Sequence, residues 1–234
     1  MVSGAGAQTA APTEVRPAAV FDHQPWEVGA LVESGVGVTE SRGGFRFLWA
    51  GVHAGKVLTG EMGKGAWRGN FEYAVEAFPL WQSYTPTFVR ANCVAIPSDP
   101  GAVSCSAPFT VGGTFTGVEV TPIILRWNLN RTRRFAFWGQ GAGGLLWTNH
   151  KYPAFGGPPY NLQNDGPNAD ASVWNFTPQG GVGVHYFLPK SPTGRARSID
   201  LGANAIHISS ASLGDRNPGV NASVQFTLGY SWWK

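Results

Sequence analysis

Apolar and polar residues alternate along several segments of the chain. Successive side chains of a β-strand point to opposite faces, so this alternation predicts strands with one apolar and one polar face. The clearest example places Phe71, Tyr73 and Val75 on one face and Glu72 and Glu76 on the other. We predict eight such strands, at about residues 26–33, 45–58, 71–77, 114–128, 135–147, 174–186, 199–209 and 221–232.

The composition favours a membrane barrel over a soluble protein. Charged residues make up 13% of the chain, against roughly a quarter in soluble domains. The chain has no apolar run as long as a membrane helix needs. A transmembrane β-barrel accounts for both features, because its strands alternate lipid-facing apolar residues with polar interior ones. We therefore predict an all-β fold, an eight-stranded antiparallel transmembrane barrel whose interior is filled by side chains. A soluble β-sandwich with the same alternation stays open as an alternative.

Residues 21–234 are predicted to form this barrel, and residues 1–20 a disordered leader or signal-peptide remnant. Glutamates on the polar face of segment 71–77 need partners in the interior, for which Arg46, Lys56 and Arg126 are candidates. The parity of the apolar positions changes near Pro122, which predicts a β-bulge there. Tryptophans near predicted strand ends suit the aromatic girdles of a membrane barrel. These tryptophans are Trp26, Trp81, Trp127, Trp147, Trp174 and Trp232.

Charge and cysteine content limit the partners of the chain. The formal net charge is +3 with no dense basic stripe, which argues against a nucleic-acid partner. Cys93 and Cys105 are the two cysteines and are predicted to form a disulfide in an oxidising compartment. The histidines and cysteines lack the spacing of a zinc site, so no metal is expected. His185 is expected in the barrel interior, bonded to a carboxylate, whereas His23, His53 and His150 carry no partner signal.

The candidate chemistry lies near the end of the chain. His207 and Ser209 are two residues apart on a predicted strand and share its apolar, lipid-side face. A histidine next to a serine suits a general base and a nucleophile. A polar pair on that face is tolerable near the lipid headgroups, where an ester hydrolase would meet its substrate. The backbone N–H groups after the serine, together with Ser210, are the candidates for holding the oxyanion.

The run from Ile199 to Trp232 resembles the lipid A 3-O-deacylase (PagL) family, whose relatives include acyloxyacyl hydrolase-like proteins. The resemblance rests on His207-Ile208-Ser209, the turn Asn217-Pro218-Gly219 and the final strand. It extends more loosely over Phe71-Glu72-Tyr73, Val120-Thr121-Pro122-Ile123, Arg126-Trp127-Asn128 and Trp174-Asn175-Phe176-Thr177. It implies a bacterial outer-membrane barrel that removes an ester-linked acyl chain from lipid A without a cofactor. The implied partners are lipid A or lipopolysaccharide and the outer-membrane lipids, while a homodimer or a larger assembly is left open.

The resemblance also implies a triad on the outer face of the barrel. Ser209 corresponds to the serine and His207 to the histidine, but the acid position is occupied by Asn221. The residue after the serine, an asparagine in the family, is Ser210 here. An asparagine can orient an imidazole but cannot stabilise its charge, so activity is expected to be low. Asp215 is the alternative acid, and a non-catalytic barrel that lost its acid is the alternative function.

Overall fold

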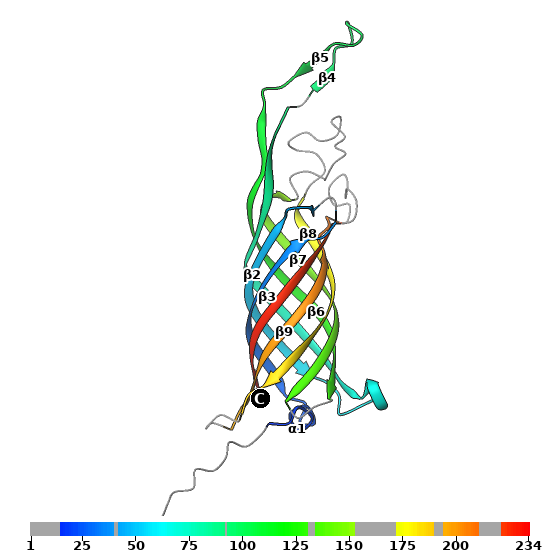
Figure 1. The fold of residues 1–234 in the computed structure, drawn as a ribbon, viewed down its shortest axis with the longest axis vertical. Coiled ribbons are helices and arrows are strands. Elements are labelled where there is room, and N and C mark those ends of the chain that lie inside the picture. The colour runs from blue at the N-terminus through cyan, green and yellow to red at the C-terminus, as the bar shows by residue number, and fades with distance from the viewer. Residues whose placement is uncertain are drawn as a thin grey trace, which may run out of the picture.

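The computed structural model describes residues 15–39, 42–91, 93–130, 134–152, 172–189, 194–210 and 221–234. Eight antiparallel strands close into a barrel in the order β1-β10-β9-β8-β7-β6-β3-β2 (Figure 1). They are β1 (Trp26–Gly37), β2 (Arg46–Val57), β3 (Gly69–Arg90), β6 (Phe109–Asn130), β7 (Phe135–Tyr152), β8 (Ser172–Phe187), β9 (Ala196–His207) and β10 (Ala222–Trp233). The prediction of an eight-stranded antiparallel barrel is therefore confirmed.

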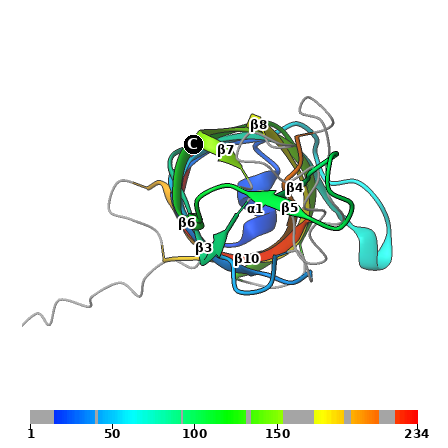
Figure 2. The same cartoon turned by 90° about the horizontal axis from the view of Figure 1, so that it is seen from above.

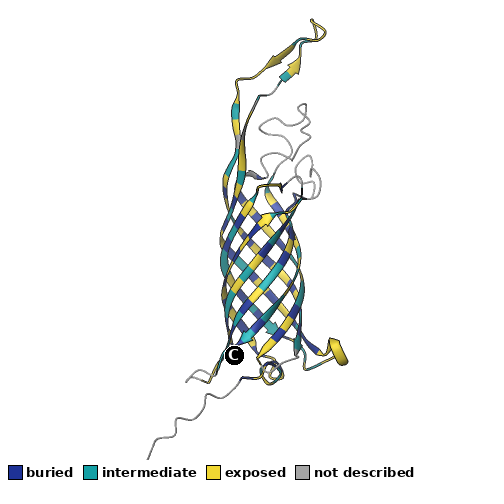
Figure 3. Ribbon diagram, in the orientation of Figure 1, coloured by how far each residue is buried: buried dark blue, intermediate teal, exposed yellow. Residues whose placement is uncertain are grey.

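The alternation along the strands is apolar outside and polar inside. On β1 the outward Val28 and Val32 are 52% and 46% exposed, whereas the inward Glu27 and Glu33 are 1% and 4% exposed. Buried and exposed positions alternate in the same way along the other strands (Figure 3). A soluble sandwich would bury its valines and expose its glutamates, so the alternative of a soluble fold is wrong. No helix among the described residues is long and apolar enough to cross a membrane.

Apolar side chains close both ends of the interior, and polar side chains fill its middle. The cluster at the end of the barrel where β9 finishes consists of Leu31, Phe47, Trp49, Phe78, Trp81, Phe115, Leu146, Tyr152, Ile206 and Ile208. The cluster at the other end consists of Val15, Phe21, Val57, Ala136, Phe187 and Trp233. The cavity that remains among the polar residues has a volume of about 30 Å³, room for a water molecule but not for a channel.

The two ends of the barrel differ in their connections. At one end the β3–β6, β7–β8 and β9–β10 connections span 18, 19 and 14 residues and β1–β2 spans 8, whereas β2–β3, β6–β7 and β8–β9 at the other end span 11, 4 and 8. Long loops mark the outer side of an outer-membrane barrel, and short turns mark the periplasmic side. The short helix α1 (Pro17–Phe21) lies under the barrel at the end with the short turns, within its outline when seen from above (Figure 2). The buried Val15 and Phe21 contribute to the apolar cluster there, so a part of the expected leader packs against the barrel.

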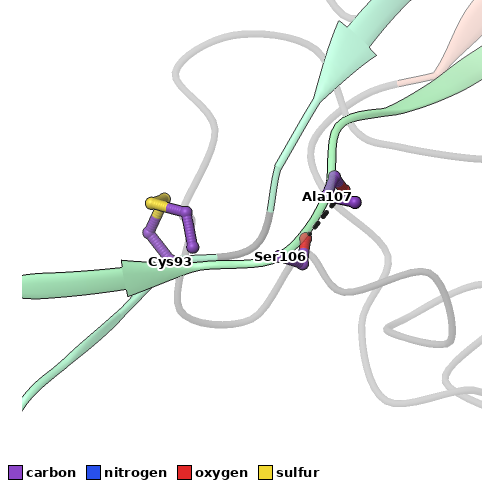
Figure 4. The surroundings of a disulfide bond; sticks show 4 residues. Cys93, Ser106 and Ala107 are labelled. Carbon is purple, nitrogen blue, oxygen red and sulfur yellow. Dashed lines mark hydrogen bonds between the residues drawn. A yellow bond between two sulfur atoms is a disulfide. The ribbon is translucent and has the colours of Figure 1, made fainter.

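The segment 84–113, which lies between two of the predicted strands, is mostly β-structure. β3 and β6 stay paired beyond the barrel, from Tyr84 opposite Thr114 to Arg90 opposite Phe109, and form a projecting ribbon (Figure 1). At its tip β4 (Cys93–Ala95) and β5 (Val103–Cys105) pair, and the expected Cys93–Cys105 disulfide is present (Figure 4). The ribbon was missed because Pro, Gly and Ser residues in this segment mask the alternation. A 3-10 turn, η2 (Gly65–Trp67), lies in the β2–β3 connection.

Register shifts explain where the faces of the long strands change. The pairing of β6 with β7 shifts between Val120 and Ile123, which confirms the bulge predicted near Pro122. A shift on β3 between Phe78 and Trp81 turns Trp81 into the interior, where it is 0% exposed. The expectation that Trp81 belongs to an outer aromatic girdle is therefore wrong. Trp26, Trp147, Trp174 and Trp232 do lie outside, with 39–56% of their surface exposed.

The interior glutamates have fewer cationic partners than expected. Arg126 donates to Glu27 at 3.3 Å and lies 4.0 Å from Glu72. Lys56 is not an interior partner, since it points outward over the ring of Trp26 and donates to the Gln24 carbonyl. Arg46 is likewise exposed.

Two histidines complete the polar interior. His53, for which the sequence carried no partner signal, lies 2.9 Å from Glu76 and 3.1 Å from Glu27. His185 lies in the interior with Nδ1 2.6 Å from Asp200 Oδ1, as expected. His53 was missed because its partners come from two neighbouring strands and only the closed sheet brings them to it.

Candidate active site

His207 ends β9 at the rim with the long connections, and Ser209 follows it on the same outward face. Ile206 and Ile208, which precede and separate the two residues, point inward and belong to the apolar cluster under this rim. The outward direction of His207 and Ser209 follows from this alternation. His207 is half-buried and Ser209 is 8% exposed. Both residues therefore take outward-facing positions near the edge of the barrel, at the level where a membrane barrel meets headgroups, with Ser209 largely covered by its neighbours.

Asn221 contacts His207 through its main chain. The Asn221 carbonyl oxygen is 3.2 Å from His207 Nδ1 and accepts a further hydrogen bond from the Ile208 N–H at 3.2 Å. A carbonyl oxygen can only accept, so Nδ1 carries the proton and donates it. The Nε2 lone pair is then available to take a proton from a substrate or a hydroxyl. The contact of Asn221 with the imidazole is thus made by its main chain, and its side chain is buried at 1% exposure.

Ser209 is held by Phe176 of β8. The Phe176 N–H donates to the Ser209 carbonyl at 2.6 Å, and the Ser209 N–H donates to the Phe176 carbonyl at 3.0 Å. Two such bonds make a directly opposed antiparallel pair, whose side chains share a face. The Phe176 ring, 39% exposed, therefore stands beside Ser209 on the outer surface. Trp174 is the next outward residue on β8 and is 48% exposed.

The remaining predicted site residues are placed only in part. Ser210 follows Ser209 at the rim and is buried at 5% exposure. The N–H of Ser209 already donates to Phe176, so a backbone donor to an oxyanion has to come from Ser210 or beyond. Asp215 and the turn Asn217-Pro218-Gly219 lie outside the described residues. The roles of Ser210 and Asp215 stay predictions.

The pairing of Ser209 with Phe176 was not foreseen from the sequence. The segment Trp174-Asn175-Phe176-Thr177 was noted only as part of the family resemblance. A single strand pattern shows which face a residue takes, but the register between β8 and β9 decides which residue stands beside it. With the outward Phe176 and Trp174, the rim presents a serine, a histidine and an apolar surface together. This combination suits cleavage of an ester whose acyl chain lies in the membrane.

Groups able to hold a metal lie elsewhere in the barrel. Among the described residues, two buried sets have ligand atoms within 4.8 Å of one another. They are Glu27 with His185 and Asp200, and Glu27 with His53 and Glu72. Both belong to the polar interior, and Asp200 lies farther down β9 than His207. These groups already pair with one another and with Arg126, so they are accounted for as an interior charge network.

A model of the lipid A 3-O-deacylase (PagL) family matches residues 39–231, well over half of the chain. The chain belongs to the lipid A 3-O-deacylase (PagL) family. The matched range contains His207, Ser209 and Asn221. As a member of the PagL family, the chain is a β-barrel of the bacterial outer membrane.

Two of the solved structures that resemble this chain are outer-membrane proteins. The outer membrane enzyme PagL is 14% identical, covers 88% of this chain and 97% of its own, and superposes with a TM-score of 0.37. The outer membrane protein OprG from Pseudomonas aeruginosa is 9% identical, covers 90% of this chain and 96% of its own, and gives a TM-score of 0.39. A comparison with curated proteins found no match.

Proposed function

We propose that this barrel is a serine esterase that hydrolyses an ester-linked acyl chain of lipid A, with Ser209 as nucleophile and His207 as general base. One observation carries the proposal. In a member of the PagL family, His207 and Ser209 share the outward face at the outer rim, and the hydrogen bond to the Asn221 carbonyl favours the tautomer of the neutral imidazole that has its lone pair on Nε2. A substrate anchored in the outer leaflet would meet the pair there.

The reaction follows from this arrangement. The Ser209 hydroxyl attacks the acyl carbonyl while His207 Nε2 takes its proton, and the same proton then passes to the departing sugar oxygen. Water attacks the acyl-serine in the second half, giving its proton to His207 and releasing the fatty acid, after which Ser209 recovers a proton. Ser210 is the proposed oxyanion donor. The Phe176 ring beside Ser209 supplies an apolar surface along which the acyl chain lies.

The rate of hydrolysis that we expect depends on Asn221. Its carbonyl orients the imidazole, as the carboxylate of a triad does, but offers only a dipole to the imidazolium that forms during the reaction. In a serine protease, exchanging the triad acid for its amide lowered kcat ~10⁴-fold, largely through the wrong tautomer. Here the carbonyl acceptor favours the useful tautomer, so we expect slow but measurable turnover. Asp215 is the remaining candidate for an added charge.

A purified full-length preparation in detergent micelles, incubated with lipid A, tests the proposal by mass spectrometry of the lipid and of the released fatty acid. Ser209→Ala and His207→Ala should each lower the release at least ~10³-fold. Ser34→Ala is the control, because Ser34 is another outward-facing serine, exposed on β1 between Phe226 and Leu48 and remote from His207. It should leave the rate unchanged. Equal release by the Ser209→Ala and unchanged proteins would refute the assignment of the nucleophile.

The absence of a carboxylate at position 221 favours a second candidate, a non-catalytic barrel with a structural or interaction role. The same experiment separates the two. If the folded protein releases no fatty acid, the non-catalytic function is supported, and release restored by Asn221→Asp or Asn221→Glu would assign the loss to the missing carboxylate. Release that depends on Ser209 excludes it.

A further inference from the structure

A hollow with a volume of about 540 Å³ lies at the end of the barrel opposite to His207. One wall comes from the segment around α1, with Val15, Arg16, Ala19, Val20, His23 and Pro25. The other comes from the start of β9 and the end of β10, with Gly194, Arg195, Ala196, Trp233 and Lys234. None of these residues takes part in the proposed esterase site.

The charged side chains that line this hollow are all cationic. Arg16, Arg195 and Lys234 are exposed and line it, and no aspartate or glutamate side chain does. Asp22, at the end of α1, is exposed but is not part of the lining. Within the described ranges of the chain, neither Arg16 nor Arg195 forms an ion pair. The hollow therefore presents guanidinium groups that are free to bind an anion.

The walls below these cations are apolar. Val15 is 4% and Trp233 is 3% exposed, and both belong to the apolar cluster at the end of the barrel where α1 lies. Val20 packs against the same cluster. Cations at the rim of an apolar wall suit an amphiphile, because its charged group and its hydrocarbon are each matched.

The depth of the hollow in the membrane follows from Trp26, which is hydrogen-bonded to Lys234 in its lining. The Trp26 N–H donates to the Lys234 carbonyl at 2.7 Å, and the Lys234 N–H donates to the Trp26 carbonyl at 2.8 Å. Trp26 is outward and 56% exposed, and Trp232 is outward and 44% exposed. Outward tryptophans at strand ends mark the headgroup level. The hollow therefore opens where the headgroups of the periplasmic leaflet lie.

We propose that this hollow binds one anionic glycerophospholipid of the periplasmic leaflet. Arg16 and Arg195 bind the phosphate, since guanidinium groups match phosphate oxygens in charge and geometry. Lys234 adds a further cation near the headgroup. The glycerol and the first carbons of the acyl chains lie along Ala19 and Val20, the accessible part of the apolar wall. A bound lipid would join the α1 segment to the barrel wall, and it would do so independently of any hydrolysis at Ser209.

Native mass spectrometry of the full-length protein in a zwitterionic detergent tests the site. The protein is titrated with phosphatidylglycerol, with phosphatidylcholine of the same acyl chains, and with glycerol phosphate alone. We expect one phosphatidylglycerol to bind at least tenfold more tightly than phosphatidylcholine. Glycerol phosphate, which lacks the acyl chains, should bind more weakly than the intact lipid.

Arg16→Gln with Arg195→Gln should lower the affinity for phosphatidylglycerol at least tenfold, to that for phosphatidylcholine. Each single variant should show part of this loss, which keeps the test valid if the double variant folds poorly. Arg46→Gln is the control, because Arg46 is exposed at the other end of the barrel. Equal affinity of the unchanged protein for both lipids, or a preference that survives both substitutions, would overturn the proposal. Lipid A hydrolysis should be the same in all of these variants.

Discussion

Replacing Arg126 with methionine should destabilise the barrel strongly. The Arg126 side chain is 5% exposed, lies 3.3 Å from Glu27 and 4.0 Å from Glu72, and donates through Nε to Gln140 at 3.0 Å. Its guanidinium also lies 4.8 Å from the centre of the Trp138 ring. Methionine preserves much of the length of the side chain but removes its charge. The carboxylates would then be left in the interior without their arginine.

The size of the effect follows from the charges of the interior. The buried carboxylates of the described strands are Glu27, Glu33, Glu72, Glu76, Glu119 and Asp200. The buried cationic candidates are Arg126, His53, His185 and Arg42, of which Arg42 lies over the rings of Phe45 and Tyr152 instead of beside a carboxylate. Breaking a buried ion pair by removing one partner costs about 3–5 kcal/mol, because the other charge stays buried and uncompensated. Since carboxylates already outnumber cations here, we expect a loss of stability in the upper part of that range.

Reversible unfolding by denaturant in micelles, followed by tryptophan fluorescence, measures this loss. Arg46→Met is the matched control, because Arg46 is exposed, and its effect should stay within about 0.5 kcal/mol. Adding Glu27→Gln and Glu72→Gln to Arg126→Met should recover most of the stability, because the uncompensated charges are then gone. A loss below about 1 kcal/mol for Arg126→Met alone would refute the view that the interior needs this cation.

Other substitutions probe the rim, the core and the ribbon. Asn221→Ala should keep the rate of acyl release within about tenfold, because the main-chain carbonyl that contacts His207 remains; a loss near 10⁴-fold would instead assign the orienting role to the amide side chain. Phe176→Ala should slow release of long acyl chains more than short ones in a chain-length series, since its ring stands beside Ser209. Trp81→Ala should cost about 3–5 kcal/mol in denaturant unfolding, because this fully buried ring contacts Trp49 and Tyr152. Exchanging both cysteines for serine should leave the unfolding midpoint of the barrel unchanged, because the disulfide lies at the tip of the ribbon.

The sequence was a good guide wherever strands have a regular period of two. The inward Glu72 and Glu76, and the outward position of His207 and Ser209, follow from that period alone. It was a poor guide where bulges change the parity. Trp81 is of a residue type typical of the aromatic girdles, yet a register shift on β3 places it in the core. Local patterns cannot show such a shift when it lies between two apolar positions.

Alternation, low charge content and tryptophan content were enough to predict a membrane barrel, and the residues around His207 and Ser209 were enough to suggest its family. These properties are local, because each residue's face depends on its own strand. The tertiary structure was needed to learn that the Asn221 carbonyl orients His207, that Phe176 stands beside Ser209, and that His53 lies between Glu27 and Glu76. Each of these contacts joins residues from different strands or connections. Closure and register of the sheet bring them together, and neither can be read from a single strand.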